Sequence, residues 1–170
     1  MRRSGVLLGM AVIAVTLASC SSSSSGTATT GQSTTATTTP SIGAAQLSHD
    51  GSIVQTSFYG PDPGNGTTTL KSGHHLVSIL IYGCSSKTGS ATFYPQYFTL
   101  KMKNNTTAPA ALGAVDNQLF SMRVSSGRCA FGKVGFEVGP GQTPAMLIFN
   151  PPNASGRLRW SVGAPTVHAP

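Results

Sequence analysis

Residues 132–149, GKVGFEVGPGQTPAMLIF, contain the clearest strand pattern in this chain of 170 residues. Between residues 133 and 138, apolar residues alternate with polar or small ones, and the apolar positions are Val134, Phe136 and Val138. Alternation with a period of two indicates a strand with one buried face. Residues 139–142, GPGQ, have the composition of a turn, and residues 144–149, PAMLIF, then predict a second strand.

Similar short segments recur along the chain. We expect further strands at residues 52–59, 75–84, 97–103, 119–124 and 157–162. Segment 75–84, HLVSILIYGC, is apolar on nearly both faces, which is typical of a central strand. Residues 107–117 are expected to form a loop, because Pro109 and Gly113 oppose a long helix. The pattern predicts an all-β fold, an antiparallel β-sandwich of about seven strands.

The first twenty residues have the layout of a secretory signal. Arg2 and Arg3 precede an uncharged apolar run at residues 5–18, which is shorter than a membrane-spanning helix requires. The run ends in residues 17–20, LASC, which resembles the lipobox of bacterial lipoproteins, where the cysteine is acylated and becomes the first residue after cleavage. We therefore expect residues 1–19 to be a lipoprotein signal peptide. Cys20 would carry acyl chains such as palmitate and hold the protein on the extracytoplasmic face of the cell membrane.

Residues 20–44 are expected to connect this anchor to a folded domain at residues 45–170. From residue 21 to about residue 42 the chain is rich in Ser and Thr and contains no charge and no aromatic residue. Such a segment cannot bury enough apolar surface to offset its conformational entropy, so a flexible tether is expected. The composition fits a plain spacer and also a segment that carries O-linked sugars.

Two cysteines remain once Cys20 is assigned to the anchor. Cys84 and Cys129 are expected to form a disulfide, because paired cysteines are the usual state in an exported domain. Two buried free thiols and a metal or redox role are the alternatives. A CxxC motif, which would favour the last of these, is absent from the sequence.

The positive charge of the chain is dispersed. Removing residues 1–19 takes away Arg2 and Arg3 and lowers the formal net charge from +7 to +5. The remaining Lys and Arg residues occur singly or in alternating pairs, with no basic run, so the charge does not indicate a nucleic-acid-binding protein. A mild attraction to a negatively charged envelope is the expected consequence.

No combination of residues identifies a catalytic centre. His49 and Asp50 fit a solvated loop or a binding pair, whereas His74 and His75, as neighbours in a strand, would point to opposite faces. The four acidic residues are far apart in sequence, which gives no support to a paired-carboxylate hydrolase: they are Asp50, Asp62, Asp116 and Glu137. We expect no enzyme activity and no cofactor.

Metal binding and aromatic stacking are also weaker interpretations than packing. The three methionines of the mature chain all lie in strand patterns, which favours core positions over copper ligation: they are Met102, Met122 and Met146. Residues 62–66, DPGNG, contain one carboxylate and are expected to form a turn and not a calcium loop. Trp160 alternates with Arg157 and Arg159, so we expect it to face the core and not to form a stacking platform.

Four segments together resemble a known family: residues 73–79 (GHHLVSI), 98–100 (FTL), 132–141 (GKVGFEVGPG) and 147–149 (LIF). Their order is similar to the immunoglobulin-like extracellular domain of actinobacterial lipoproteins of unknown function, a sandwich similar to that of mycobacterial immunoprotective extracellular antigens. The resemblance covers about residues 53–162 and implies an immunoglobulin-like β-sandwich. The chain departs from the pattern in its early Asn104-Asn105 turn and its extra cysteine pair. No catalytic residues come with the resemblance.

The sequence therefore predicts a lipid-anchored envelope protein whose β-sandwich is a binding or interaction module. The membrane would be contacted through the lipid, and an envelope protein or glycopolymer would be the partner. A carrier of a small hydrophobic or envelope ligand is one alternative and requires an apolar cavity. A hydrolase of envelope polymers is a second alternative, and it requires some of the histidines and carboxylates to converge.

Overall fold

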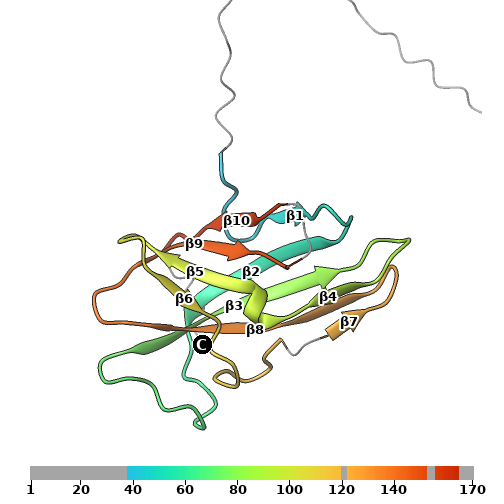
Figure 1. Cartoon of the computed structure of the whole chain (residues 1–170). Helices are drawn as coiled ribbons and strands as arrows, with labels where there is room; N and C mark the ends of the chain where they lie inside the picture. The colour runs from blue at the N-terminus through green and yellow to red at the C-terminus, as the bar shows by residue number, and fades with distance from the viewer. Residues whose placement is uncertain (1–37, 120–121, 153–155, 165–170) are drawn as a thin grey trace, which may run out of the picture. The chain divides into compact units, whose positions relative to one another are not determined.

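The computed structural model describes residues 38–119, 122–152 and 156–164; the predicted signal peptide, Cys20 and most of the predicted tether lie outside them. This part of the chain forms ten strands and one 3₁₀ helix, η1 (Figure 1). Their bounds are β1 Ala45–Leu47, β2 Ile53–Pro61, β3 His75–Cys84, β4 Ala91–Phe93, η1 Pro95–Tyr97, β5 Phe98–Met102, β6 Thr107–Pro109, β7 Met122–Val124, β8 Cys129–Val138, β9 Pro144–Phe149 and β10 Leu158–Ser161. Within the described ranges, no helix has the length and hydrophobicity needed to cross a bilayer.

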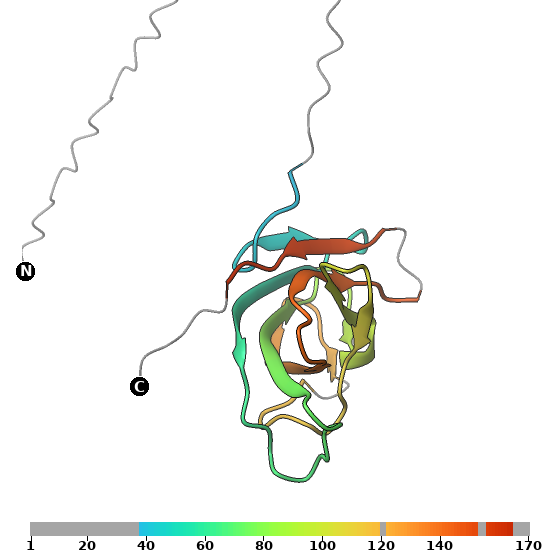
Figure 2. The same ribbon diagram turned by 90° about the vertical axis from the view of Figure 1, so that its left-hand side faces the viewer.

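Eight strands form two antiparallel sheets that enclose one core. Sheet 1 has the order β1-β2-β3-β8, and sheet 2 has the order β10-β9-β5-β6. Strands β4 and β7 pair separately as a two-stranded ribbon. Figure 2 looks along the sandwich and shows the strands of both sheets around a shared interior. The predicted all-β sandwich is confirmed.

Aromatic and branched side chains fill the space between the sheets. The largest fully buried side chains include those of Trp160, Phe93, Phe98, Phe136, Ile79 and Ile81. The indole N–H of Trp160 donates a hydrogen bond to the carbonyl oxygen of Ala44 at 2.8 Å, so this large ring is buried without an unsatisfied donor. The expectation that Trp160 packs in the core, and is not a stacking platform, is correct.

Short bridges connect the sheets at both sides of the sandwich. Ser41 pairs with Ser161 of β10, and on the opposite side Ala110 pairs with Phe136 of β8. Ile42 and Ala44 pack against the core, and the Gly43 N–H donates to the Thr56 hydroxyl at 3.1 Å. The folded part therefore begins before Ala45, which corrects the expected boundary between tether and domain.

The longer predicted strands agree with the structure, apart from their ends. Strand β3 has the expected bounds, and in β5 the residues Phe98, Leu100 and Met102 are buried as the alternation indicates. In β2 a bulge between Thr56 and Phe58 shifts the register and places Tyr59 in the core. Strands β8 and β9 follow one another through the predicted turn, but they belong to different sheets and do not pair.

Three-residue strands account for the difference between about seven predicted strands and ten observed ones. Strands β1 and β4 were not expected, and β6 lies in the segment 107–117 that was expected to be a loop. Pro109 is compatible with this strand because β6 is the edge strand of sheet 2. Three residues are too few to show a period-two pattern in the sequence.

Residues 110–119 cover part of the outer face of sheet 1. Ala114 and Val115 are buried against Leu76 of β3, which forms a second, smaller apolar cluster. Gly135 of β8 lies on the face that the alternation at residues 133–138 assigns to solvent, but a Cβ atom there would lie 2.7 Å from the Val115 side chain. The glycine is needed because this segment packs directly on the strand.

Cys84 and Cys129 form a disulfide, which is the pairing that the sequence predicts. They are direct cross-strand partners at the adjoining ends of β3 and β8. We call this end of the sandwich the disulfide end. The turn at residues 48–52 and the loops next to β4 and β7 also lie here, because Ile53 pairs with Cys84 and the Ser85 N–H donates to the Arg128 carbonyl.

Candidate functional site

A cleft of about 330 Å³ opens at the disulfide end, between the turn that precedes β2, the segment from β4 to η1, and the loop after β9. Its volume falls within the range of small-ligand sites. We call it the tyrosine pocket and define it by its lining residues His49, Asp50, Tyr94, Tyr97, Pro151 and Pro152.

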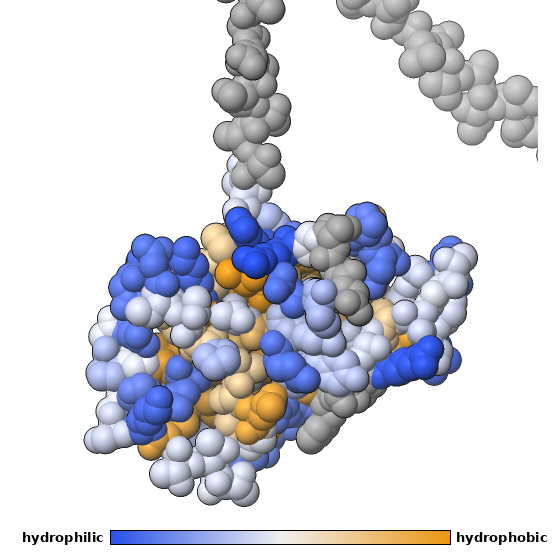
Figure 3. Space-filling model, viewed as in Figure 1, coloured by the Kyte–Doolittle hydropathy of each residue, from blue (hydrophilic) through white to orange (hydrophobic). Residues whose placement is uncertain are grey.

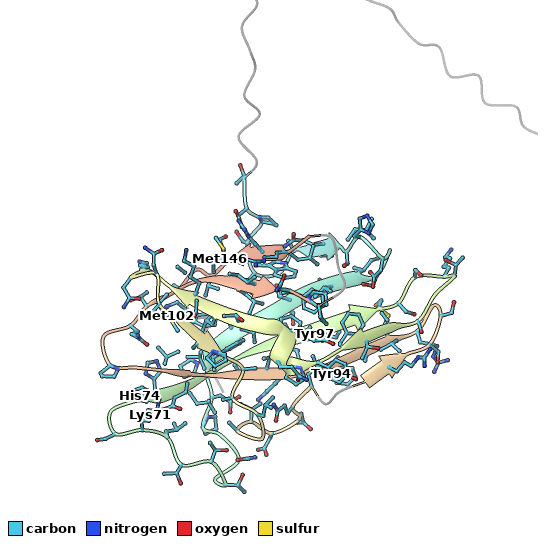
Figure 4. All side chains as sticks on the ribbon, viewed as in Figure 1. Lys71, His74, Tyr94, Tyr97, Met102 and Met146 are labelled. Carbon is cyan, nitrogen blue, oxygen red and sulfur yellow. A yellow bond between two sulfur atoms is a disulfide. The ribbon has the colours of Figure 1, made fainter. Side chains whose placement is uncertain are left out.

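Tyr94 and Tyr97 form the aromatic wall of the pocket (Figure 4). Pro95 begins η1 between them, and the Tyr97 N–H donates to the Tyr94 carbonyl at 3.0 Å, so the two rings come from one tight turn. The ring centroids are 5.1 Å apart and the planes make an angle of 74°, which is an edge-to-face contact. The pair is therefore held in a defined geometry.

The core supports this aromatic pair from behind. The Tyr97 ring contacts Phe149 of β9 with a centroid distance of 6.3 Å, and the Tyr97 carbonyl accepts the Asn150 N–H at 2.8 Å. Asn150 directly precedes Pro151 and Pro152, so the same hydrogen bond fixes the start of the proline wall. The pocket is largely formed before any ligand binds, which reduces the entropy lost on binding.

Asp50 supplies a fixed negative charge at the edge of the pocket. Its Oδ1 accepts hydrogen bonds from the Ser52 N–H at 2.9 Å and the Ser52 hydroxyl at 2.6 Å. Burial raises the pKa of Asp50, but the hydrogen bonds from Ser52 and Ser48 outweigh it and bring the pKa below its usual value. Asp50 is therefore ionised at neutral pH and can accept hydrogen bonds from ligand hydroxyl groups.

Among the described residues, His74 and Glu137 form the one ion pair between a histidine and a carboxylate. His74 Nδ1 lies 3.0 Å from Glu137 Oε1, and the same oxygen accepts the Lys71 N–H at 2.9 Å. Both side chains are partly exposed at the end of the sandwich opposite the disulfide end, and Figure 4 shows His74 and Lys71 there. The contacts join the β2–β3 loop to β8, which gives the pair a structural role.

The other predicted site candidates are separate from each other. His75 lines a different cleft, of about 510 Å³, with polar neighbours that include Lys103 and Gln142. Asp62 is buried and its Oδ2 lies 3.0 Å from Lys133 Nζ. Burial raises the pKa of Asp62, yet hydrogen bonds from the Gly64 N–H and the Lys133 ammonium, with the positive charge of Lys133, bring it below the usual value. Asp116 is exposed.

Two of the three methionines considered as copper ligands have described side chains, and both lie in or near the core. Met102 is buried in β5 and Met146 is half-buried in β9, whereas the side chain of Met122 is outside the described atoms (Figure 4). In the part of the chain that the structure describes, no group of three or more His, Cys, Asp or Glu side chains could hold a metal ion. The residues 62–66 make the expected turn, in which the Gly64 N–H donates to Asp62 Oδ1 at 2.9 Å.

Sequence reasoning found only the polar edge of the tyrosine pocket. His49 and Asp50 were recognised as a possible binding pair, but Tyr94 lies outside the predicted strands, and Tyr97 was included only as the first residue of the strand predicted at residues 97–103. Pro151 and Pro152 directly follow the strand predicted at residues 144–149, and no site role was expected for them. The available signal was the spacing of two tyrosines around a proline in Tyr94-Pro95-Gln96-Tyr97.

Comparisons with known proteins show the fold. No protein-family model matches the chain, and no curated protein matches it. Among solved structures, the secreted protein MPT63 of Mycobacterium tuberculosis is similar with a TM-score of 0.57 and 15% identity, over 73% of this chain and 96% of MPT63. The yjhA protein of Bacillus subtilis is similar with a TM-score of 0.57 and 14% identity, over 73% of this chain and 99% of that protein.

A third similar structure is ycdA of Bacillus subtilis, a candidate lipoprotein, with a TM-score of 0.53 and 13% identity. The match covers 68% of this chain and 37% of ycdA. The structural similarity establishes the shared β-sandwich, whereas the low sequence identity does not allow site residues to be transferred to this chain. The immunoglobulin-like lipoprotein family therefore remains a prediction from the sequence motifs, and what the comparisons establish is the sandwich itself.

Proposed function

We propose that this chain is a lipid-anchored protein on the extracytoplasmic face of the cell membrane, and that its sandwich binds a saccharide of the envelope in the tyrosine pocket. The observation that carries the proposal is the edge-to-face pair of Tyr94 and Tyr97 beside the ionised carboxylate of Asp50. The lipobox-like residues 17–20 supply the location. The names of two similar structures, one a secreted protein and one a candidate lipoprotein, are in keeping with it.

A sugar ring matches the chemistry of this pocket on two sides. The C–H groups on one face of a pyranose carry partial positive charge and pack on the electron-rich face of a tyrosine. The hydroxyl groups at the ring edge are donors, and a carboxylate is their strongest neutral-pH acceptor in a protein. Tyr94, Tyr97 and Asp50 provide both kinds of contact within one cleft.

Titration calorimetry with solubilised envelope glycan fragments tests this proposal. Tyr94→Ala should weaken binding about tenfold, because it removes one stacking ring, and Asp50→Asn should weaken it by a similar factor through loss of a charge-assisted hydrogen bond. Tyr82→Ala is the matched control, since Tyr82 is an exposed tyrosine of β3 outside the pocket. Equal affinity of the wild type and Tyr94→Ala, or binding of proline-rich peptides in place of glycans, would contradict the proposal.

The proposal assigns no enzyme activity to the chain. Hydrolysis would need the His74–Glu137 pair to face a nucleophile or an activated water. The contacts of Glu137 instead go to His74 and to the Lys71 backbone, in keeping with a brace between two segments. His74→Ala should therefore leave the glycan affinity unchanged and should lower stability slightly; glycan cleavage by the wild type that His74→Ala abolishes would establish the hydrolase alternative.

The carrier alternative is less well supported by the interior. The inner faces of both sheets are occupied by fully buried side chains, among them Trp160, Phe98 and Phe136. The cleft of about 510 Å³ at the opposite end has a mixed lining that includes His75, Lys103 and Gln142. Tyr59, Pro144 and Val162 line the same cleft, so it is the place at which binding of a hydrophobic cargo would have to be tested.

A further inference from the structure

The outer face of sheet 1 is apolar and exposed near the disulfide end. Leu47 is 69% exposed, Ile53 44%, Tyr82 37% and Phe131 68%. We call these four residues the outer apolar patch. They come from four different strands, β1, β2, β3 and β8.

Strand pairing shows that the patch is continuous. Leu47 pairs with Ile53, and Ile53 pairs with Cys84, which is joined to Cys129. In the next row Tyr82 pairs with Phe131, and their ring centroids are 5.9 Å apart. Residues paired across strands share a face, so Leu47, Ile53 and the disulfide form one row of the outer face. Tyr82 and Phe131 lie side by side in the adjacent row, in which Gln55 of β2 is the polar member.

Basic residues border the patch at the same end. The loop after β3 and the loop before β8 are hydrogen-bonded: the Gly127 N–H donates to the Ser86 carbonyl at 2.9 Å, and Ser126 donates to the Lys87 carbonyl. These loops and β7 carry three exposed cations, Lys87, Arg123 and Arg128, which we call the basic tip. Figure 1 shows the loops extending beyond β4 and β7, and Figure 3 shows hydrophilic residues at this end.

Acidic residues are mostly elsewhere. Glu137 lies at the opposite end of sheet 1, and Asp62 is paired with Lys133 there. Asp116 is in the segment that covers the outer face of β8 away from the tip. Asp50 is the carboxylate near the tip, so three cations face one anion. An apolar face with a cationic border complements a bilayer whose headgroups are anionic.

We propose that the outer apolar patch and the basic tip dock the domain on the surface of an anionic lipid bilayer. The inference rests on the proposed lipid anchoring for its cellular setting. Seventeen residues, 21–37, separate Cys20 from the first described residue, Thr38, and the covalent length of this segment limits the distance to on the order of 60 Å. Residues 41–44 then run directly into β1, which carries Leu47 of the patch.

Vesicle sedimentation tests this docking without involving the lipid anchor or any glycan. A protein of residues 37–170 is suitable because it contains the whole core and the disulfide within one compact unit. It should bind vesicles of equal parts phosphatidylglycerol and phosphatidylcholine at low salt, and bind pure phosphatidylcholine at least tenfold more weakly. Absence of binding to the anionic vesicles, or equal binding to both kinds, would overturn the inference.

Two pairs of variants separate the patch from general surface properties. Phe131→Ser should lower the partition coefficient about tenfold, whereas Leu112→Ser, at a residue that is 61% exposed outside the patch, should leave it unchanged. Arg128→Glu should lower it about fivefold or more, whereas Arg159→Glu in β10 should have a smaller effect. Equal effects within either pair would overturn the assignment to this face. If the wild type forms a dimer and does not bind vesicles, and Phe131→Ser is a monomer, the face would instead be an interface with a second copy of the chain.

This outcome is independent of the proposed function. Glycan binding in the tyrosine pocket would persist in Phe131→Ser if only the docking surface is affected. Vesicle binding would persist in Tyr94→Ala if only the pocket is affected. Each proposal can therefore be refuted without affecting the other.

Discussion

Cys84 and Cys129 face each other across β3 and β8 with their Cα atoms 4.0 Å apart, and the disulfide joins residues 45 positions apart in the sequence. The intervening chain contains β5, β6 and the β4–β7 ribbon, and it also contains Tyr94 and Tyr97. The segment that supplies the two pocket tyrosines thus leaves sheet 1 after Cys84 and returns to it at Cys129, and the disulfide joins these two points. The crosslink restricts the unfolded chain in the region that carries the candidate site.

Replacing both cysteines by alanine should therefore lower the free energy of unfolding by about 4 kcal/mol, the chain-entropy value for a loop of this length. Urea denaturation of residues 37–170 with and without the double substitution measures the difference. Non-reducing peptide mapping of the wild type should recover the Cys84–Cys129 crosslink. Two alkylated free thiols would refute the pairing.

Gly132→Ala should destabilise the fold more than an ordinary surface substitution. A Cβ atom at this position would lie 2.6 Å from the Leu119 Cα and 2.7 Å from the Leu119 nitrogen, and backbone atoms cannot rotate away. We expect a loss of about 1–3 kcal/mol in thermal or urea unfolding, as in overpacked cores. Gly163→Ala is the control, because nothing lies within 4 Å of its Cβ position. Equal stability of the two variants would show that residues 111–119 do not pack on β8 as described.

Acid should weaken the fold through Asp62. The folded state holds the pKa of this carboxyl below 3.8, so its contribution to stability is complete above that value and is lost as the pH falls through the lower pKa of the folded state. The free energy of unfolding should decline from about pH 5 to about pH 2. Asp62→Asn should flatten the decline, whereas Asp116→Asn, at an exposed position, should not. An unchanged pH profile in Asp62→Asn would contradict the role of the Asp62–Lys133 pair.

Cys20 should determine the location of the protein. Intact-mass measurement of the membrane-extracted protein should show loss of residues 1–19 and addition of acyl chains. Cys20→Ala should leave the membrane fraction, because the covalent anchor is gone and surface docking alone is reversible. Retention of Cys20→Ala in the membrane fraction after a high-salt wash would refute the lipobox assignment.

Much of the sandwich could be predicted because its long strands bury one face. Strands β3, β5 and β9 each show an apolar pattern that sequence reasoning can detect, and Trp160 follows from the alternation in β10. Strands β1, β4 and β6 have three residues each, so they depend on partners that only the tertiary structure supplies. Gly135 was placed on the solvent side because the covering by Val115 is a long-range contact.

The candidate site was less predictable than the fold. Its residues come from three parts of the chain, near positions 50, 95 and 151, and no local spacing connects them. Asp50 and His49 were noticed because their chemistry is distinctive, whereas the tyrosines resemble ordinary apolar residues until the structure shows them at a cleft. The outer apolar patch was missed for a related reason. Phe131 is exposed because no other described segment covers the outer face of β8 at the disulfide end, and the sequence does not show which part of a strand is covered.

The most direct test of the proposed function is a two-dimensional NMR titration of ¹⁵N-labelled residues 37–170 with solubilised envelope glycan. Saturable shifts should appear at the amides of His49, Asp50 and Tyr97, which line the tyrosine pocket, and they should disappear in Tyr94→Ala. Amides at the opposite end, such as Gly141, should not move. Shifts that cluster at that opposite end, or no saturable shifts at any glycan concentration tested, would contradict the account.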